Sequence, residues 1–193
     1  MSHAQATRLR AALLDPMAAQ QIEVAGASPA AVLAPLFERD GDLHAVFTKR
    51  RSHLRLHAGQ ISFPGGRREE GDTDLIQTAL REAHEEIGLD PGAVTLVGAL
   101  RPTPTVVSDI AIYPIVGLIA PPTGAWAIAA DEVEAVIEES LTRLASTHHL
   151  LTVERLDGER VTTDAYTVGA DTIWGATGRI VADLLSRVAL QVA

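Results

Sequence analysis

The sequence predicts an α/β (α+β) protein in which a mixed β-sheet is covered by helices. Two observations predict this class: strand-like apolar runs are interspersed with a few helical segments, and Asp-Gly pairs mark hairpins between strands. Hairpins join antiparallel neighbours, so a doubly wound parallel sheet is disfavoured. The 193 residues have the length of one domain, and no repeat or low-complexity linker divides residues 1–193.

Apolar periodicity predicts where the helices and strands lie. Helices are expected over residues 4–14, 74–87 and 172–190. Strands are expected over residues 31–37, 43–48, 94–100, 110–119 and 133–137. The hairpin turns are expected at Asp40-Gly41 and Asp157-Gly158, because these residue types accept the backbone conformations of tight turns.

The central helix has marked ends and two distinct faces. Asp72, Thr73 and Asp74 offer capping oxygens at its start, and Gly88 followed by Pro91 offers a stop. At 100° per residue, one arc of the helix is apolar and suited to packing. Its members are Ile76, Ala79, Leu80, Ala83 and Ile87.

The adjoining arc of this helix carries Glu82, Glu85 and Glu86. Like charges at this spacing repel one another, so a compensating cation is expected. Carboxylate oxygens suit Mg²⁺ or Mn²⁺, and the chain has no cysteine to favour zinc. A solvated acidic face is the usual interpretation of helical glutamates, but the surrounding segment argues against it here.

The segment from Gly66 to Leu89 resembles the Nudix box, a loop and helix with the pattern G-x5-E-x7-R-E-U-x-E-E-x-G-U, in which U is apolar. Arg81-Glu82, Glu85-Glu86, Gly88 and Leu89 match its second half. Upstream, Asp72 stands in place of glutamate and the spacing to Arg81 is one residue longer. The resemblance implies a Nudix-type α/β/α sandwich with a loop-helix catalytic motif.

A second signature resembles the motif LLTxR[SA]x3Rx3Gx3FPGG of Nudix hydrolases that cleave coenzyme A. Its matching positions are Thr48, Arg50, Arg55, Gly59 and Phe63-Pro64-Gly65-Gly66. Val46-Phe47 replaces the leading LL, and Arg51 stands where Ser or Ala is expected. Ile173 to Thr177 resembles the IWGxT segment of the same group, whose members also share the aspartate and the longer spacing.

The resemblance implies hydrolysis of a pyrophosphate bond with Mg²⁺ or Mn²⁺, giving 3′,5′-ADP and 4′-phosphopantetheine from coenzyme A. Glu82, Glu85 and Glu86 would hold the metal, and Glu85 is either a ligand or the group that deprotonates water. Arg81 would fix a glutamate rotamer. Glu132, in a DEV segment similar to one in the superfamily, is a further catalytic candidate, with a solvated turn as the favoured alternative.

Substrate binding is expected from basic and glycine positions near residues 49–68. Six of the sixteen basic residues fall in these twenty positions, within a chain of net charge −9. Arginine forks suit phosphate oxygens, and the motif favours Arg50 and Arg55, although solvation is an alternative for each. Gly65 and Gly66 allow the backbone to approach the metal site or to adopt positive φ, or they form a plain tight turn.

The composition argues against broad nucleic-acid binding, a membrane span and a histidine metal site. The pI of 5.2 argues against broad nucleic-acid binding, and no apolar run is long enough to span a membrane. The absence of cysteine and of a recognisable signal favours the cytoplasm. None of the seven histidines has a metal-binding spacing, and Trp174 is interpreted as a core residue. The sequence does not determine the oligomeric state.

Two other functions remain open from the sequence. A Nudix pyrophosphatase could act on ADP-ribose, NADH or a nucleoside triphosphate, because the helix specifies only pyrophosphate chemistry. A Nudix-like domain could also bind a nucleotide without turnover, which is usually indicated by missing glutamates. All three glutamates are present here, which favours an enzyme.

Overall fold

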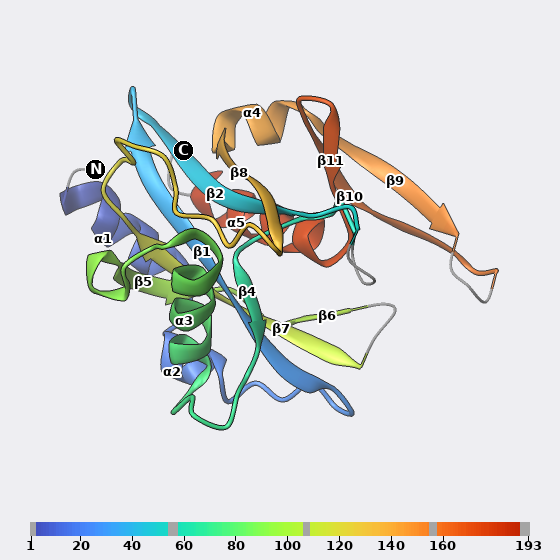
Figure 1. The fold of residues 1–193 in the computed structure, drawn as a ribbon, viewed down its shortest axis with the longest axis horizontal. Helices are drawn as coiled ribbons and strands as arrows, with labels where there is room; N and C mark the ends of the chain where they lie inside the picture. The colour runs from blue at the N-terminus through green and yellow to red at the C-terminus, as the bar shows by residue number, and fades with distance from the viewer. Residues whose placement is uncertain (1–2, 54–57, 106–108, 155–157, 190–193) are drawn as a thin grey trace.

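The computed structural model describes residues 3–53, 58–105, 109–154 and 158–189 (Figure 1). Its helices are α1 (His3–Ala12), α2 (Pro16–Ala19), α3 (Leu75–Ile87), α4 (Leu141–Ser146) and α5 (Gly175–Ala189), with a 3-10 turn η1 (Pro91–Ala93). Its strands are β1 (Ser28–Arg39), β2 (Asp42–Arg50), β3 (Ile61–Ser62), β4 (Gly65–Arg67), β5 (Thr95–Ala99), β6 (Thr103–Pro104), β7 (Ile110–Leu118), β8 (Val133–Ser140), β9 (His148–Glu154), β10 (Arg160–Val168) and β11 (Asp171–Ile173).

The larger sheet is mixed, as the sequence predicts. Its central path runs β3-β2-β1-β7-β5, while β4 pairs with β1, β6 with β7, and β8 with β2. The long pair β1 and β7 is parallel, whereas β1 and β2 are antiparallel. A smaller sheet, β11-β10-β9, extends away from it on the right of Figure 1.

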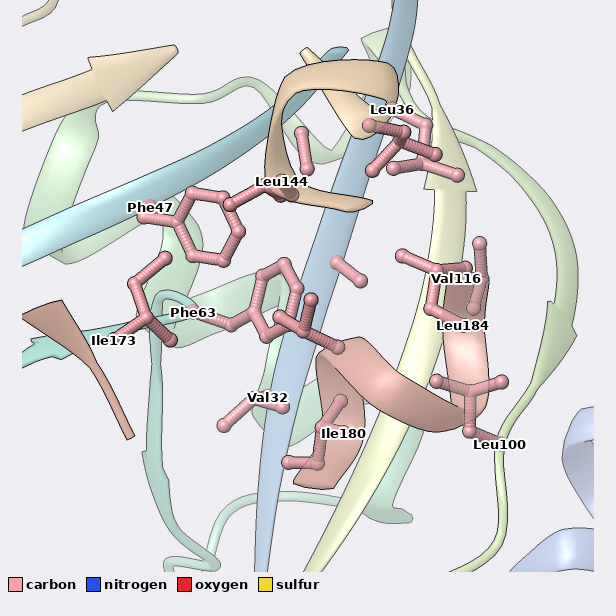
Figure 2. Packing of buried hydrophobic residues seen from close by; sticks show 14 of the residues in the cluster. Val32, Leu36, Phe47, Phe63, Leu100, Val116, Leu144, Ile173, Ile180 and Leu184 are labelled. Carbon is pink, nitrogen blue, oxygen red and sulfur yellow. The ribbon is translucent and has the colours of Figure 1, made fainter. Parts of the chain in front are cut away.

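Strand β1 separates two hydrophobic cores because its side chains alternate between the faces of the sheet. Val32 and Leu36 pack in one cluster with Ile180 and Leu184 of α5 (Figure 2). Leu33 and Phe37 belong to the other cluster, which also contains Leu75, Ala79, Ala83 and Ile87 of α3. Helices therefore cover both faces, and the expected α/β/α sandwich is confirmed.

The first expected hairpin is confirmed. Asp40 and Gly41 form a two-residue turn with φ angles of 53° and 81°, which match the positive φ values of a type I′ turn. Strands β9 and β10 are likewise antiparallel neighbours, and Gly158 has a φ of 83°. Asp157 of that second turn lies outside the described residues.

Two helix boundaries differ from the prediction. Thr172 and Ile173 belong to β11, where Ile173 pairs with Tyr166, so the last helix begins at Gly175. The first helix ends at Ala12, and Leu14 instead forms a β-bridge with Ala99. In both cases pairing with a strand takes residues that local periodicity assigns to a helix. None of the helices in the described ranges is long and apolar enough to cross a membrane.

Candidate active site

Helix α3 fixes the direction of the acidic side chains. Its start is capped by Asp74, whose Oδ1 accepts the Gln77 N–H at 2.8 Å. Its end is capped by Gly88 in the left-handed conformation, with φ at 69°, and the Gly88 N–H donates to the His84 carbonyl oxygen at 2.9 Å. Because the apolar arc is buried against the sheet, the acidic arc is turned toward the neighbouring strand β4.

Glu86 is the most buried of the three glutamates, with an exposure of 6%. Its Oε2 accepts a long hydrogen bond of 3.4 Å from Thr48 Oγ1 on β2. Burial, together with the negative charges of Glu82 and Glu132, raises the pKa of Glu86 to about 7, although Arg50 opposes the shift. Glu86 is therefore a desolvated carboxylate in a negative environment.

Glu82 lies one helical turn from Glu86 and against the backbone of β4. Its Oε1 accepts a 3.0 Å hydrogen bond from Arg81 Nη1, and burial raises its pKa. A Cβ atom on Gly66 would collide with the Glu82 carboxylate. Gly65 and Gly66 are strand residues paired with Val32 and Ala31, rather than a tight turn, and the close approach explains the glycine.

Glu85 is the most exposed member of the cluster, with 56% of its side chain accessible. Its Oε2 accepts a 3.0 Å hydrogen bond from the same Arg81 Nη1 that binds Glu82. Across the described residues, no three acidic or histidine side chains converge as metal ligands. Glu82 and Glu85 thus share one Arg81 donor, whereas Glu86 accepts from Thr48.

Arg81 is anchored by an aspartate that the sequence analysis assigned to helix capping. Its Nε lies 3.0 Å from Asp72 Oδ1, and its Nη2 lies 3.0 Å from Asp72 Oδ2. Arg81 strongly lowers the pKa of the buried Asp72, which also accepts hydrogen bonds from Thr78 Oγ1 and the Glu69 N–H. The nine-residue separation of Asp72 and Arg81 carries no periodic signal, so the contact was missed.

Arg50 and Glu132 lie close enough to Glu86 for their charges to act on it. Arg50 Nη1 is 3.8 Å from Glu132 Oε2, and the Arg51 N–H donates to the Glu132 carbonyl oxygen at 2.9 Å. Arg50 lowers the pKa of Glu86 and Glu132 raises it, so both side chains lie close to the acidic cluster. Arg55, the other expected substrate-binding arginine, lies outside the described residues.

A cavity of about 410 Å³ adjoins this cluster. Gly65, Gly66 and Arg50 line it, and so do residues of β9, β10 and the start of α5. Trp174 also lines it and is only partly buried, which corrects its assignment to the core. Phe63 both lines the cavity and stacks on Phe47 at 4.5 Å between ring centroids.

The residues fit a divalent cation on chemical grounds. In the part of the chain that the structure describes, Glu86 forms no ion pair, although it is buried beside two other carboxylates. A buried carboxylate in such surroundings is unfavourable unless a cation compensates it. Oxygen ligands from Glu82 and Glu86 suit Mg²⁺ or Mn²⁺.

Comparisons with known proteins agree with this geometry. A family model described as the NUDIX domain matches residues 27–151. Proteins called "Uncharacterized Nudix hydrolase NudL" from Escherichia coli O7:K1 and Salmonella paratyphi B are each 38% identical over 165 residues, covering 84% of this chain and 83% of theirs.

Solved structures show the same fold. A MutT/nudix family protein from Enterococcus faecalis gives a TM-score of 0.56 at 16% identity, covering 87% of this chain and 64% of that one, so this chain spans less than two thirds of its length. The MutT protein from Methanosarcina mazei Go1 gives a TM-score of 0.55 at 14% identity, covering 88% of this chain and 98% of that one. With the matched domain and the relatives' identity, these likenesses show that the chain belongs to the Nudix hydrolase family.

Proposed function

We propose that this Nudix hydrolase cleaves the pyrophosphate bond of coenzyme A, or of a coenzyme A derivative, to give 3′,5′-ADP and 4′-phosphopantetheine. The observation that carries the proposal is the position of Gly66, which lies against the Glu82 carboxylate and also lines the cavity. A pyrophosphate at this end of the cavity would lie beside the acidic cluster. The remaining space would hold the groups on either side of the anhydride.

The glutamates would bind the metal ion and accept the proton from water. Glu82 and Glu86 would hold Mg²⁺ or Mn²⁺, and Glu85 would be either a further ligand or a base. The cation would supply charge neutralisation and a lowered pKa for water. Glu85 or Glu132 would accept the proton as the water oxygen bonds to one phosphorus and the bond from that phosphorus to the bridging oxygen breaks.

Arg81 would position Glu82 and Glu85 rather than touch the substrate. Its guanidinium is held by both oxygens of Asp72, which leaves Nη1 directed at the two glutamates. The fixed Arg81 guanidinium would keep the two carboxylates in one arrangement before the substrate binds. Arg50, which lines the cavity, would contact the phosphates.

The second sequence motif favours coenzyme A over other substrates. Thr48 of this motif contacts Glu86, and Arg50, Phe63, Gly65 and Gly66 all line the cavity. The motif residues thus gather beside the site, as expected if they select the substrate. ADP-ribose, NADH and nucleoside triphosphates are the alternative substrates, and nucleotide binding without turnover is the alternative function.

Turnover assays would test the proposal directly. Coenzyme A, ADP-ribose, NADH and ATP would be compared with Mg²⁺ or Mn²⁺, products would be identified by mass, and Glu86→Gln would be assayed alongside. Release of 3′,5′-ADP from coenzyme A, absent in the variant, is the expected result. Preference for another substrate would overturn the coenzyme A assignment, and no turnover of any would favour the binding function.

A further inference from the structure

One wall of the cavity carries the cationic side chain of Arg179. Arg179, in the second turn of α5, lines the cavity, and its Nη2 donates to the Pro104 carbonyl oxygen of β6. Over the described ranges, no acidic side chain forms an ion pair with Arg179. Asp164, whose charge acts on Arg179, is itself 2.8 Å from His148 Nε2.

The surroundings of Arg179 leave its guanidinium available to an anion within the cavity. Burial lowers the pKa of Arg179, which means that its surroundings disfavour the charged form. A partly buried guanidinium is stabilised when an anion binds it with charge-assisted hydrogen bonds. The first turn of α5 lines the same wall and adds the positive end of a helix. The wall is therefore suited to an anionic group of a ligand.

The anion at this wall would be distinct from one at the acidic cluster. Strands β4, β1, β7 and β6 are consecutive neighbours, so Gly66 beside Glu82 and Pro104 beside Arg179 are three strands apart. At ~4.8 Å per strand, their backbones are separated by roughly 14 Å. A ligand that reaches both ends needs two anionic groups joined by a spacer.

The spacer would contact mainly apolar side chains. Val32, Ile112, Val153 and Val161 line the cavity, and Trp174 adds a partly exposed indole ring. Such walls suit a flat heterocyclic base, which can pack between aliphatic groups and an aromatic ring. An uncharged pantetheine arm in the same place would leave Arg179 without an anion.

We propose that Arg179 binds the 3′-phosphate of the substrate's ribose and that the apolar walls beside it hold the adenine. This inference rests on the proposed function, and it identifies the 3′-phosphorylated adenosine half as the part bound in the cavity. The 3′-phosphate distinguishes coenzyme A from dephospho-coenzyme A, ADP-ribose and NADH. Arg179 is thus a specificity-determining residue for the reaction, and it takes no part in the chemical step.

Kinetics of Arg179→Gln with coenzyme A and 3′-dephospho-coenzyme A would test this role. The glutamine keeps a donor for Pro104 and removes the charge. The KM for coenzyme A should rise roughly 10- to 100-fold with kcat nearly unchanged, and the KM for dephospho-coenzyme A should stay constant. Arg179→Lys should restore part of the discrimination. Arg160→Gln, which removes an exposed charge outside the cavity lining, is the matched control.

Binding without metal gives a readout that is independent of turnover. Calorimetry would compare 3′,5′-ADP with 5′-AMP, which lacks the 3′-phosphate, for the natural protein and for Arg179→Gln. Preference for 3′,5′-ADP that disappears in the variant supports the inference, even if no coenzyme A is hydrolysed and the proposed function fails. Equal binding of the two nucleotides by the natural protein, or equal loss of both in the variant, would overturn it.

Discussion

Arg81 binds Asp72 through two parallel contacts, Nε to Oδ1 at 3.0 Å and Nη2 to Oδ2 at 3.0 Å. The aspartate side chain is 3% exposed and lies before helix α3, whereas Arg81 lies on the helix itself. This pair therefore joins the loop that follows β4 to the helix that carries the glutamates. The remaining Arg81 donor, Nη1, is directed at Glu82 and Glu85.

Asp72→Asn should lower both stability and turnover. The amide cannot provide two acceptors for the guanidinium, so a buried ion pair is lost, at about 2–4 kcal/mol in the free energy of unfolding. Turnover should fall more than tenfold, because Arg81 no longer holds the two glutamates. Urea unfolding and the coenzyme A assay would measure these effects.

The pH dependence provides a further check on the Asp72 variant. Because the pKa of Asp72 is lowered in the folded protein, its stabilisation is complete above the ordinary aspartate pKa of about 4 and is lost as the pH falls through the folded value. The stability difference between the natural protein and Asp72→Asn should therefore shrink in acid. Asp74→Asn removes the same charge but keeps a capping side chain, so an equal loss there would contradict the prediction.

Alanine should affect turnover at Gly66 and stability at Gly65. The three atoms nearest to a Cβ on Gly66 all belong to the movable carboxylate of Glu82, so Gly66→Ala should fold normally and lose at least tenfold in turnover. A Cβ on Gly65 meets the backbone of β1, so Gly65→Ala should lose about 1–3 kcal/mol of stability. Thermal unfolding and kinetics of the pair would separate the two roles, and equal stability losses would refute the distinction.

Glu86→Gln should stabilise the metal-free protein while removing activity. The folded pKa of Glu86, about 7, is above its ordinary value of 4.5. The carboxylate charge therefore destabilises the fold increasingly as the pH rises from 4.5 to 7, and fully above 7. The variant should gain up to about 3 kcal/mol at pH 8 and little at pH 4. Chemical unfolding at both pH values would show this, and a gain confined to acid would oppose it.

Metal affinity should increase with pH around neutrality. A carboxyl group with a pKa of about 7 must lose its proton before it can bind Mn²⁺, so each unit below pH 7 should weaken binding by about tenfold. Titration calorimetry at pH 6 and pH 8 would measure the change and the protons released. In Glu86→Gln the same pH dependence should disappear, and its persistence would assign the proton to another group.

Local signals in the sequence were sufficient for the central helix and for the first hairpin. The ends of α3 are set by Asp74 and Gly88, and its direction is set by the apolar arc. The turn between β1 and β2 is set by the backbone preferences of Asp40 and Gly41. All of these features depend on residues close together in the chain. Sequence reasoning could therefore predict the helix that carries the acidic cluster.

Features that are too short to show a period, or that depend on distant partners, could not be predicted in the same way. Strand β11 exists because Ile173 pairs with Tyr166, and its three residues are too short to show a period. The partial exposure of Trp174 depends on the cavity formed by β9, β10 and α5. The role of Asp72 requires the position of Arg81 in space, which follows only from the packing of α3.

Because side chains alternate along β1, a change in the length of this strand would affect both faces of the sheet. A one-residue insertion in the middle of β1 would exchange the residues that face α3 with those that face α5, and would also shift the pairing of Ala31 with Gly66. The space for Glu82 depends on that pairing. An insertion or deletion in this strand would thus damage folding and the acidic cluster together.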